Sequence, residues 1–595
     1  MYKFFPGDKV TEKPPKTGYN ISILKKKGGI VFMKIVIVGG VAGGATAAAR
    51  IRRLDEKAEI VIFERSGFIS YANCGLPYYI GGVITDESAL TLQSPKGFFT
   101  RFHIKAKVHH EVLSVNPEKK TVSVKNLGDG SVFEESYDKL LLAPGAKPFV
   151  PDIPGVDSEK IFTLRSMEDT FRIKEFTEKS KPKTAAIIGG GFVGIEMAEN
   201  LSEAGTKVVI IEQAKQLLST FDSDMASFIH SEIRRNGITL ALGKTVTGFS
   251  EKNGGIDVLF GEGLPIHADM VILAIGVRPE NTLAKSAGIR LGIKGSIEVN
   301  EKMETSVKDI YAVGDAVQIK NYVSNDYMVN ALAGPANKQA RIAADNICGK
   351  NSSYKGSVGS SVIKVFSLTA ASTGLSESAA KRAGFFTDKV ILSPMSHAGY
   401  YPGGKVMTIK VVFEKETFRI LGAQIAGYDG VDKRIDVIAA AIHAGMRADE
   451  LSELDLAYAP PYSSAKDPVN MAGFMAENVK EGILKQWFIE DAERLLKMSR
   501  VTLLDTRTEW EFNRGHIEGF MNIPVDELRE RIDEIPNGDP VYVICQSGLR
   551  SYIACRILKG YGFNAYNFAG GFRFYDAVMN DRRLAEESFP CGMDR

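Results

Sequence analysis

One cysteine, Cys74, lies in a stretch whose composition suits a reactive thiol. The stretch is SYANCGLPY, residues 70–78, in which Gly75 and Pro77 predict an irregular turn or the start of a helix. A thiol near a helix N-terminus has a lowered pKa, and the thiolate is the nucleophile. No second cysteine lies within ten residues. The chemistry of Cys74 therefore needs an outside sulfur partner, as a mixed disulfide, a persulfide or a sulfenic acid.

A second cysteine, Cys545, begins a loop that suits a negatively charged sulfur atom. It follows an apolar run, residues 540–544, and opens the segment CQSGLRS, which leads into a predicted helix. Backbone N–H groups and the N-terminus of that helix stabilise a thiolate and its persulfide, and Arg550 adds positive charge. A loop of six residues, 545–550, fits sulfane sulfur better than a bulkier anion.

The totals exclude several functional classes. The chain of 595 residues, enough for three to five domains, has 74 Lys and Arg against 72 Asp and Glu, so it has no charge pattern typical of a nucleic-acid or membrane partner. No apolar run approaches the roughly 20 residues of a membrane span. Five dispersed cysteines favour a reducing, cytoplasmic location over a disulfide framework. Three of them, Cys348, Cys555 and Cys591, receive no role. His109 and His110 lack the spacing of metal ligands, so we expect no metal.

A glycine-rich turn, GGVAGG at residues 39–44, is the first element that would position Cys74. An apolar run, residues 34–38, precedes it, a helical run, residues 45–54, follows, and a second strand ends at Glu64, 20 residues past Gly44. Glycines let a pyrophosphate approach a helix N-terminus, and the acid binds a ribose hydroxyl. We therefore expect a first dinucleotide site, with Val41 in place of the usual middle glycine, at Gly39, Val41, Ala42, Gly43, Gly44, Glu64 and Arg65.

A second turn, GGGFVG at residues 189–194, repeats the pattern in full register. It lies between a strand, residues 184–188, and a helix, residues 195–204, and the next strand closes at Glu212, 18 residues past Gly194. An acid there favours the free 2′-hydroxyl of NADH, although Lys215, three residues on, leaves NADPH possible. We assign this second site to Gly189, Gly191, Gly194, Glu196, Glu212 and Gly276.

Two dinucleotide folds in one chain indicate one bound flavin and one exchanging nicotinamide. The segments YDKLLLAPG, residues 137–145, and TSVKDIYAVGD, residues 305–315, resemble the two flavin signatures of the flavoprotein reductases with two dinucleotide-binding domains. The resemblance implies an FAD domain in two parts, 33–149 and 277–345, with an NAD domain, 150–276, between them. It places Asp315 on the ribityl chain and adds Asn73, Gly145 and Ala333 to the cofactor residues.

The last two regions differ in pattern. Residues 346–483 mix strands and helices, and by the same resemblance they form an α+β dimerisation domain. On composition alone, the aromatic segments at residues 396–403 and 456–468 are loops, which are more often structural than catalytic. Residues 484–595, with DTR at 505–507 and the CQSGLRS loop, resemble the rhodanese family along their whole length.

From Met33 onward the chain resembles the coenzyme A-disulfide reductases that carry a C-terminal rhodanese domain, a group that includes NADH-dependent persulfide reductases. The motifs are GGVAGGATAAARIRRLD, SYANCGLPY, SHAGYYPG, DKRIDV and AYAPPYSSAKDP. The resemblance implies a homodimer, with Cys74 as redox nucleophile beside FAD and with Tyr400 and Tyr458 reaching the thiol from the partner subunit. The coenzyme A positions that it implies are Thr46, Arg50, Arg53, Ser70, Asn73 and Lys466.

We therefore expect an α/β protein with two Rossmann-like domains, an α+β dimerisation domain and an α/β rhodanese domain. Its expected activity is NADH-dependent reduction of a persulfide, polysulfide or disulfide of coenzyme A, with Cys545 carrying sulfane sulfur. Three alternatives stay open: a strict coenzyme A-disulfide reductase with a regulatory rhodanese domain, a sulfur carrier, and an NADH oxidase or peroxidase. The last is disfavoured because that branch has a histidine where Ala42 stands. Residues 1–32 would precede a natural start at Met33.

Overall fold

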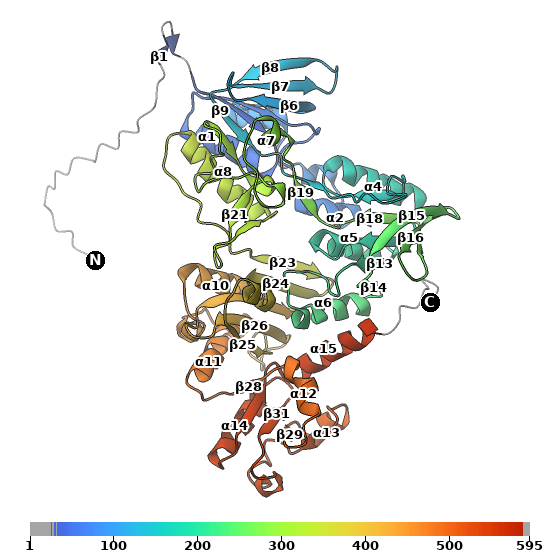
Figure 1. The fold of residues 1–595 in the computed structure, drawn as a ribbon, viewed down its shortest axis with the longest axis vertical. Coiled ribbons are helices and arrows are strands. Elements are labelled where there is room, and N and C mark those ends of the chain that lie inside the picture. The colour runs from blue at the N-terminus through green and yellow to red at the C-terminus, as the bar shows by residue number, and fades with distance from the viewer. Residues whose placement is uncertain (1–24, 27–28, 31, 587–595) are drawn as a thin grey trace, which may run out of the picture.

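The computed structural model describes residues 25–26, 29–30 and 32–586 (Figure 1). Apart from the short pair β1 (Lys25–Lys26) and β2 (Gly29–Ile30), nearly all of segment 1–32 lies outside the described residues. The natural start at Met33 therefore stays a prediction. Residues 33–586 form four units, and the first and last lie at opposite ends of the long axis of the molecule (Figure 1).

The first dinucleotide unit contains a parallel sheet of five strands in the order β20-β9-β3-β4-β5. β20 comes from far along the chain, yet it pairs with β9, and Ile310 lies opposite Leu140. Helix α1 begins at Ala42 rather than at Ala45, because Gly43 and Gly44 continue the turn directly into the helix. α1 packs against α8 beside the sheet. The bounds are β3 (Lys34–Val38), β4 (Glu59–Phe63), β5 (Lys105–Lys107), β9 (Lys139–Leu142), β20 (Ile310–Ala312), α1 (Ala42–Leu54) and α8 (Ala333–Ile347).

The second dinucleotide unit repeats this design between β9 and β20 in the chain. Its parallel sheet has the order β11-β18-β12-β13-β14, and its central strands are apolar and buried, as expected for a sheet covered on both faces. The bounds are β11 (Ile161–Thr163), β12 (Thr184–Ile188), β13 (Lys207–Glu212), β14 (Thr239–Leu242), β18 (Met270–Leu273), α4 (Met167–Ser180), α5 (Phe192–Glu203) and α6 (Ser223–Arg235).

The third unit, which we call the antiparallel unit, has five strands in the order β23-β24-β27-β26-β25. Helix α10 packs against β24 and β27. The bounds are β23 (Ser361–Val365), β24 (Leu368–Gly374), β25 (Thr387–Leu392), β26 (Met407–Glu414), β27 (Ile420–Gly427), α9 (Glu377–Arg382), α10 (Val431–Ala444) and α11 (Pro468–Lys480).

The C-terminal unit has a parallel sheet in the order β28-β32-β31-β29-β30. One hydrophobic cluster joins this unit to the second and third units and includes Ile229 of α6, Ile391 of β25 and Phe574 of α15. The architecture confirms the predicted fold class. The bounds are β28 (Gln486–Trp487), β29 (Thr502–Asp505), β30 (Met521–Asn522), β31 (Val541–Ile544), β32 (Ala565–Phe568), α12 (Ala492–Leu496), α13 (Glu509–Asn513), α14 (Leu549–Gly560) and α15 (Gly571–Glu586).

Candidate active site

Cys74 lies in a short 3-10 turn, Asn73–Gly75, that continues into helix α2 (Leu76–Ile80). The Gly75 N–H closes this turn on the Ala72 carbonyl at 2.9 Å, and Pro77 occupies the first turn of α2. Helix α2 packs against α5 of the second dinucleotide unit. The two units therefore meet at the cysteine, whose side chain is exposed on this chain.

The pKa of Cys74 is raised, and the sequence-based expectation of a lowered pKa is wrong for the chain as described. Although the side chain is exposed, enough protein surrounds the sulfur for desolvation to be the largest cause. The Glu196 carboxylate adds to the shift, and the Arg165 guanidinium opposes it. Helix α2 has only five residues, so its N-terminus offers the thiolate little compensation. The cysteine therefore needs a further positive group or a proton acceptor to react as a thiolate at neutral pH.

Among the acidic residues, Glu196 has the largest effect on the pKa of Cys74. It stands on α5, five residues after the Gly191 N-cap, and burial together with the neighbouring Glu199 raises its pKa to about 7. A carboxyl group with that pKa changes its charge in the physiological range. The Cys74 thiol therefore interacts electrostatically with a carboxyl group whose negative charge depends on pH.

Arg165 is a residue of the Cys74 site that the sequence did not indicate. Its guanidinium donates to Asp315 Oδ2 at 2.7 Å and to the Ala146 carbonyl at 3.1 Å. In the amide orientation that satisfies both partners, Asn73 donates to the Arg165 carbonyl at 2.9 Å and accepts from its guanidinium at 3.2 Å. Arg165 thus ties the cysteine turn to the expected ribityl acid. It stands in a plain strand-to-helix loop, before the cap of α4, so no local motif distinguishes it.

The first glycine turn has the close approaches that a dinucleotide cradle requires. A Cβ on Gly44 would lie 1.8 Å from the Gly39 carbonyl oxygen, and one on Gly39 would lie 2.1 Å from the Ala143 oxygen. Glu64, at the end of β4, accepts the Gly40 N–H at 2.8 Å, and burial raises its pKa. Val41 is the N-cap of α1, where a side chain is tolerated. The residues present therefore fit a bound FAD.

The second turn borders a cavity of about 460 Å³. Glu212 accepts the Gly190 N–H at 2.7 Å, the same arrangement as in the first turn, and a Cβ on Gly194 would lie 2.0 Å from the Gly189 oxygen. Lys215, the residue that left NADPH possible on sequence grounds, is not among the residues that line this cavity. The lysine that lines it is Lys244. The lining also includes Gly189, Gly191, Glu212 and Gly276, so most of the residues assigned to the second site lie together.

The expected coenzyme A residues fall into two groups. Helix α1 carries Thr46, Arg50 and Arg53, and the first two face α8: Thr46 donates to Asn337 at 2.5 Å, and Arg50 pairs with Asp345 at 2.8 Å. Arg53 is exposed. Ser70 has a φ of +48° and donates its N–H to Gly40 at 2.8 Å, while Lys466 is exposed on the loop before α11 of the antiparallel unit.

Tyr400 and Tyr458 lie together on the antiparallel unit. Their hydroxyls are 2.7 Å apart, and the hydrogen bond between them is the main cause that raises the pKa of Tyr458. The side chains are 75% and 46% exposed. The charged groups that shift the pKa of Cys74 on the same chain are Glu196, Arg165 and Asp315, and neither tyrosine is among them.

Cys545 is fully buried at the end of β31. Its sulfur accepts the Gly548 N–H at 3.1 Å and the Ser551 hydroxyl at 3.2 Å. Arg550, expected to assist the thiolate, forms two hydrogen bonds of 2.7 Å to Glu511, which α13 presents to the loop. These bonds are the main cause of the raised pKa of Arg550, and the charge of Cys545 adds to it, so the guanidinium also interacts electrostatically with the cysteine. Ser551 ends the quoted CQSGLRS segment, but the sequence analysis gave it no role. The loop is a sulfur cradle made by one backbone and one side-chain donor.

Models of known protein families match most of this chain and identify the family to which it belongs. The profile of the pyridine nucleotide-disulphide oxidoreductases matches residues 33–338, and the dimerisation domain of that family matches residues 360–468. The chain belongs to the pyridine nucleotide-disulphide oxidoreductase family. The rhodanese-like domain profile matches residues 488–577. This member of the family is therefore an FAD- and pyridine nucleotide-dependent oxidoreductase with a C-terminal rhodanese-like domain.

Relatives within the pyridine nucleotide-disulphide oxidoreductases are similar over most of their length. The coenzyme A disulfide reductase of Staphylococcus aureus (strain bovine RF122 / ET3-1) is 38% identical over 446 residues, which is 75% of this chain and 100% of the relative. The structure of reduced Bacillus anthracis CoADR-RHD matches with a TM-score of 0.90 and 46% identity over 93% of this chain and 99% of that chain. An NAD-dependent persulfide reductase from A. fulgidus matches with a TM-score of 0.86 and 36% identity over 91% and 100%. The resemblance inferred from the motifs is confirmed.

Membrane-spanning helices and metal-binding clusters are both absent from the described residues. Within residues 25–26, 29–30 and 32–586, no helix is both long enough and apolar enough to span a membrane. In the same part of the chain, no group of histidine, cysteine and acidic side chains has the arrangement of a metal site.

Proposed function

We propose that this chain is a homodimeric flavoenzyme that uses NADH to reduce sulfane sulfur carried by a small thiol, with coenzyme A as that thiol. One observation carries the proposal: a lone cysteine, Cys74, stands where two dinucleotide units meet, and the same chain holds Cys545 in a cradle of hydrogen-bond donors. A lone redox cysteine takes its sulfur partner from outside, and a donor-lined loop stabilises a persulfide. The similarity to a persulfide reductase supports the same conclusion.

In the proposed reaction, the Cys74 thiolate attacks the outer sulfur of a persulfide, RSSH. The S–S bond breaks, RS⁻ leaves and takes a proton from Tyr458, and Cys74 becomes a persulfide. Two electrons and one proton then convert this group into the Cys74 thiolate and hydrogen sulfide. FAD, when bound, carries those electrons from NADH. In total, RSSH, NADH and one proton give RSH, hydrogen sulfide and NAD⁺.

The cofactor assignments rest on the two glycine turns. We propose that NADH binds in the cavity of about 460 Å³ with its ribose on Glu212, an acid that favours NADH over NADPH. FAD would lie along the first turn, with its ribose on Glu64 and its ribityl chain near Asp315. The other FAD residues are Gly39, Val41, Ala42, Gly43, Gly44, Arg65, Asn73, Gly145 and Ala333, and Gly189, Gly191, Gly194, Glu196 and Gly276 complete the NADH set.

For coenzyme A, the phosphates need cations that are free to bind them. Arg53 and Lys466 are exposed and suit this role. Arg50 contributes less, because Asp345 already holds its guanidinium at 2.8 Å. Thr46, Ser70 and Asn73 complete the proposed set.

The position of the tyrosines supports a homodimer. Tyr400 and Tyr458 are exposed and belong to the part of the chain that matches the dimerisation domain. If the tyrosines of each subunit act on the Cys74 of its partner, a site that contains both the nucleophile and the proton donor exists only in the dimer. We also propose a cytoplasmic location, since the chemistry of Cys74 depends on reduced thiols.

Reduction of coenzyme A disulfide is a second candidate function, favoured by the similarity to the coenzyme A disulfide reductases. Cys74 would attack the disulfide in the same way, and two thiols would form per NADH, with the rhodanese-like domain in a regulatory role.

An anaerobic comparison of substrates separates the two candidates. The FAD-loaded protein is given NADH with either coenzyme A persulfide or coenzyme A disulfide, and Cys348→Ser serves as a control variant for cysteine replacement. We expect kcat/KM for the persulfide to exceed that for the disulfide by about tenfold or more, which is about 1.4 kcal/mol of transition-state stabilisation. A preference of the same size for the disulfide would overturn the proposal.

A further inference from the structure

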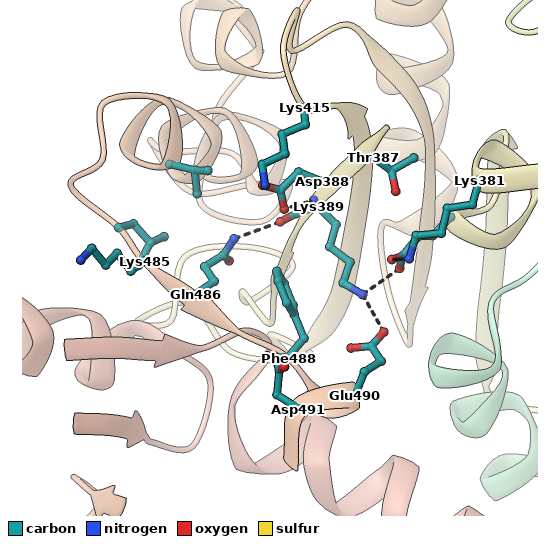
Figure 2. Close-up of a pocket in the computed structure, with 13 residues that line it drawn as sticks. Lys381, Thr387, Asp388, Lys389, Lys415, Lys485, Gln486, Phe488, Glu490 and Asp491 are labelled. Atoms are coloured by element: carbon teal, nitrogen blue, oxygen red, sulfur yellow. Dashed lines mark hydrogen bonds and ion pairs between the residues drawn. The ribbon is translucent and has the colours of Figure 1, made fainter. Parts of the chain in front are cut away.

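The C-terminal unit is docked onto the rest of the chain through two charged joints. In the first, the Lys389 ammonium of β25 lies between Glu490, 2.7 Å away in the C-terminal unit, and Glu377, 2.8 Å away on α9 (Figure 2). This joint borders a cavity of about 510 Å³ between the antiparallel and C-terminal units. In the second, helix α15 lies along α6 of the second dinucleotide unit, where Phe574 and Phe228 are 6.2 Å apart between ring centroids (Figure 1).

The centre of the second joint is a histidine whose tautomer is set by its hydrogen-bond partners. His230 of α6 is 1% exposed, and its Nδ1 lies 2.8 Å from Asp581 Oδ2 of α15. Its Nε2 accepts the Leu217 N–H at 3.0 Å. A ring nitrogen that accepts a hydrogen bond carries no proton, so the proton is on Nδ1 and is donated to Asp581. Asp581 thereby selects the one neutral tautomer that can hold Leu217.

The Leu217 amide belongs to the loop that closes the second glycine turn. This loop, residues 213–222, joins β13 to α6. Its next amide, Leu218 N–H, donates to the Gly190 carbonyl at 2.9 Å, and the Leu217 side chain packs so closely that a Cβ on Gly190 would lie 2.3 Å from it. Gly190 and Glu212 line the cavity assigned to NADH. A continuous series of contacts therefore runs from Asp581 through His230 and Leu217 to the nucleotide turn.

We propose that the rhodanese-like domain is a positioning element of the NADH site: Asp581 acts through His230 to hold the loop 213–222 against Gly190, so that NADH affinity depends on the docking of α15. This inference rests on the proposed binding of NADH at the second turn. Asp581 touches no substrate and is a positioning residue. The expected effect of breaking the series is weaker NADH binding with an unchanged rate of hydride transfer.

Replacing Asp581 by asparagine tests the tautomer argument directly. Arg234 also pairs with Asp581, through the other carboxylate oxygen. The asparagine side chain has one oxygen atom. Because a guanidinium can only donate hydrogen bonds, we expect Arg234 to donate to that oxygen. The amide NH2 then faces His230 Nδ1, which must become the acceptor. The proton moves to Nε2, where it meets the Leu217 N–H, and the loop loses its anchor.

The experiment is stopped-flow reduction of the flavin by NADH in the FAD-loaded full chain, without any sulfur compound. For Asp581→Asn we expect the Kd for NADH to rise about tenfold, or about 1.4 kcal/mol, with the limiting rate constant unchanged. Adding Arg234→Gln should restore the Kd to within about threefold of wild type, because the single amide oxygen can then face His230. Asp576→Asn, the same change at an exposed position of α15, should have no effect.

Three results would overturn the inference: a Kd in Asp581→Asn within about twofold of wild type, a lower limiting rate with an unchanged Kd, or a double variant worse than the single one. Retained thiosulfate sulfurtransferase activity in each variant shows that the C-terminal unit is folded. An error in the proposed sulfur substrate leaves this assay unaffected. A wild-type protein whose flavin NADH cannot reduce would overturn the inference and the proposed function together.

Discussion

The hydroxyls of Tyr400 and Tyr458 lie 2.7 Å apart, so that one tyrosine donates a hydrogen bond to the other. The two residues come from separate loops, on either side of α10, and both side chains are exposed. A tyrosine pair of this kind can pass a proton to a leaving thiolate and regain it from solvent. The charged groups that shift the pKa of Cys74 on its own chain do not include these tyrosines. The proposed function therefore has the pair act on Cys74 of the partner subunit.

Mixed dimers test this arrangement. Cys74→Ser and Tyr458→Phe are each expected to lower kcat by about a hundredfold or more as homodimers, since one lacks the nucleophile and the other the proton donor. Coexpressed together, they should recover about a quarter of wild-type activity, because half of the dimers then contain one site with both residues. Tyr462→Phe, at another exposed tyrosine of the same segment, serves as the control. Failure of the mixture to exceed the two homodimers would contradict a shared site.

Glu196 is expected to control the reactivity of Cys74 in a pH-dependent way. Its pKa, raised to about 7 by burial and then by Glu199, means that it gains negative charge as the pH rises through 7. That charge raises the pKa of the Cys74 thiol. Glu196→Gln should therefore lower the thiol pKa, and alkylation of Cys74 by iodoacetamide at pH 8 should become about threefold faster.

The alkylation is followed at Cys74 alone by mass spectrometry of the peptide that contains it. Glu203→Gln, at the exposed end of the same helix, should leave the pH profile unchanged. An unshifted profile in Glu196→Gln would show that this carboxylate does not control the thiol.

Lys410 holds the second dinucleotide unit to the antiparallel unit from a buried position. Its ammonium is 1% exposed and lies 2.8 Å from Asp224, 3.1 Å from Asp222 and 2.9 Å from Glu377. Lys410→Met leaves these buried carboxylates without their main counter-charge. We expect the free energy of unfolding to fall by about 3–5 kcal/mol, measured by urea denaturation. Lys415→Met, at an exposed lysine just beyond β26, should cost far less.

The pH dependence of this cluster has a defined sign. Burial alone would raise the pKa of Glu377, but Lys410 and Lys389 outweigh it and lower the pKa below the usual 4.5. The stabilisation is therefore present above pH 4.5 and is lost as the pH falls through the lowered pKa of the folded state. The wild type should lose stability below pH 4.5, and Lys410→Met should lose less. An equal loss in both proteins would assign the acid sensitivity to other groups.

Glu511 is expected to set the position of Arg550 beside the Cys545 loop. The hydrogen bonds from Arg550 are the main reason that the pKa of Glu511 falls to about 2. Glu511→Gln removes the charge that holds the guanidinium, and thiosulfate sulfurtransferase activity should drop by about tenfold. Glu509→Gln, two residues away and exposed, is the matched control.

The pH profile of that activity provides a second check. Because Glu511 stays ionised down to about pH 2, it should contribute no step between pH 4 and 9 in the wild type. Sulfurtransferase activity that survives Glu511→Gln unchanged would show that Arg550 is positioned by other contacts.

The parts of the site that the sequence predicts are those with local geometric causes. Gly39 and Gly44, like Gly189 and Gly194, must be glycine because a Cβ would collide with nearby backbone, and Glu64 and Glu212 follow at fixed distances along the βαβ unit. The folding of the C-terminal unit around Cys545 follows in the same way from an apolar strand, a tight loop and a helix.

The parts that the sequence does not predict depend on contacts between distant segments. Arg165 joins Asn73 to Asp315, and no local pattern marks it. The raised pKa of Cys74 arises from burial and from Glu196, which belongs to another unit, whereas the local sequence indicates only a helix N-terminus. Arg550 is held by Glu511, 39 residues away, a partner that the loop sequence does not indicate. Each of these needs the packing of whole units, which short-range patterns do not contain.

The measurement that tests the central claim most directly is the stoichiometry of NADH oxidation and sulfide release, without oxygen, with coenzyme A persulfide as substrate. Wild type, Cys74→Ser and Cys545→Ser are compared under the same conditions. We predict one sulfide released for each NADH oxidised in the wild type, no reaction in Cys74→Ser, and a retained rate on the small persulfide in Cys545→Ser. Sulfide release that persists without Cys74, or NADH oxidation by the wild type without sulfide, would contradict the proposed role of this cysteine.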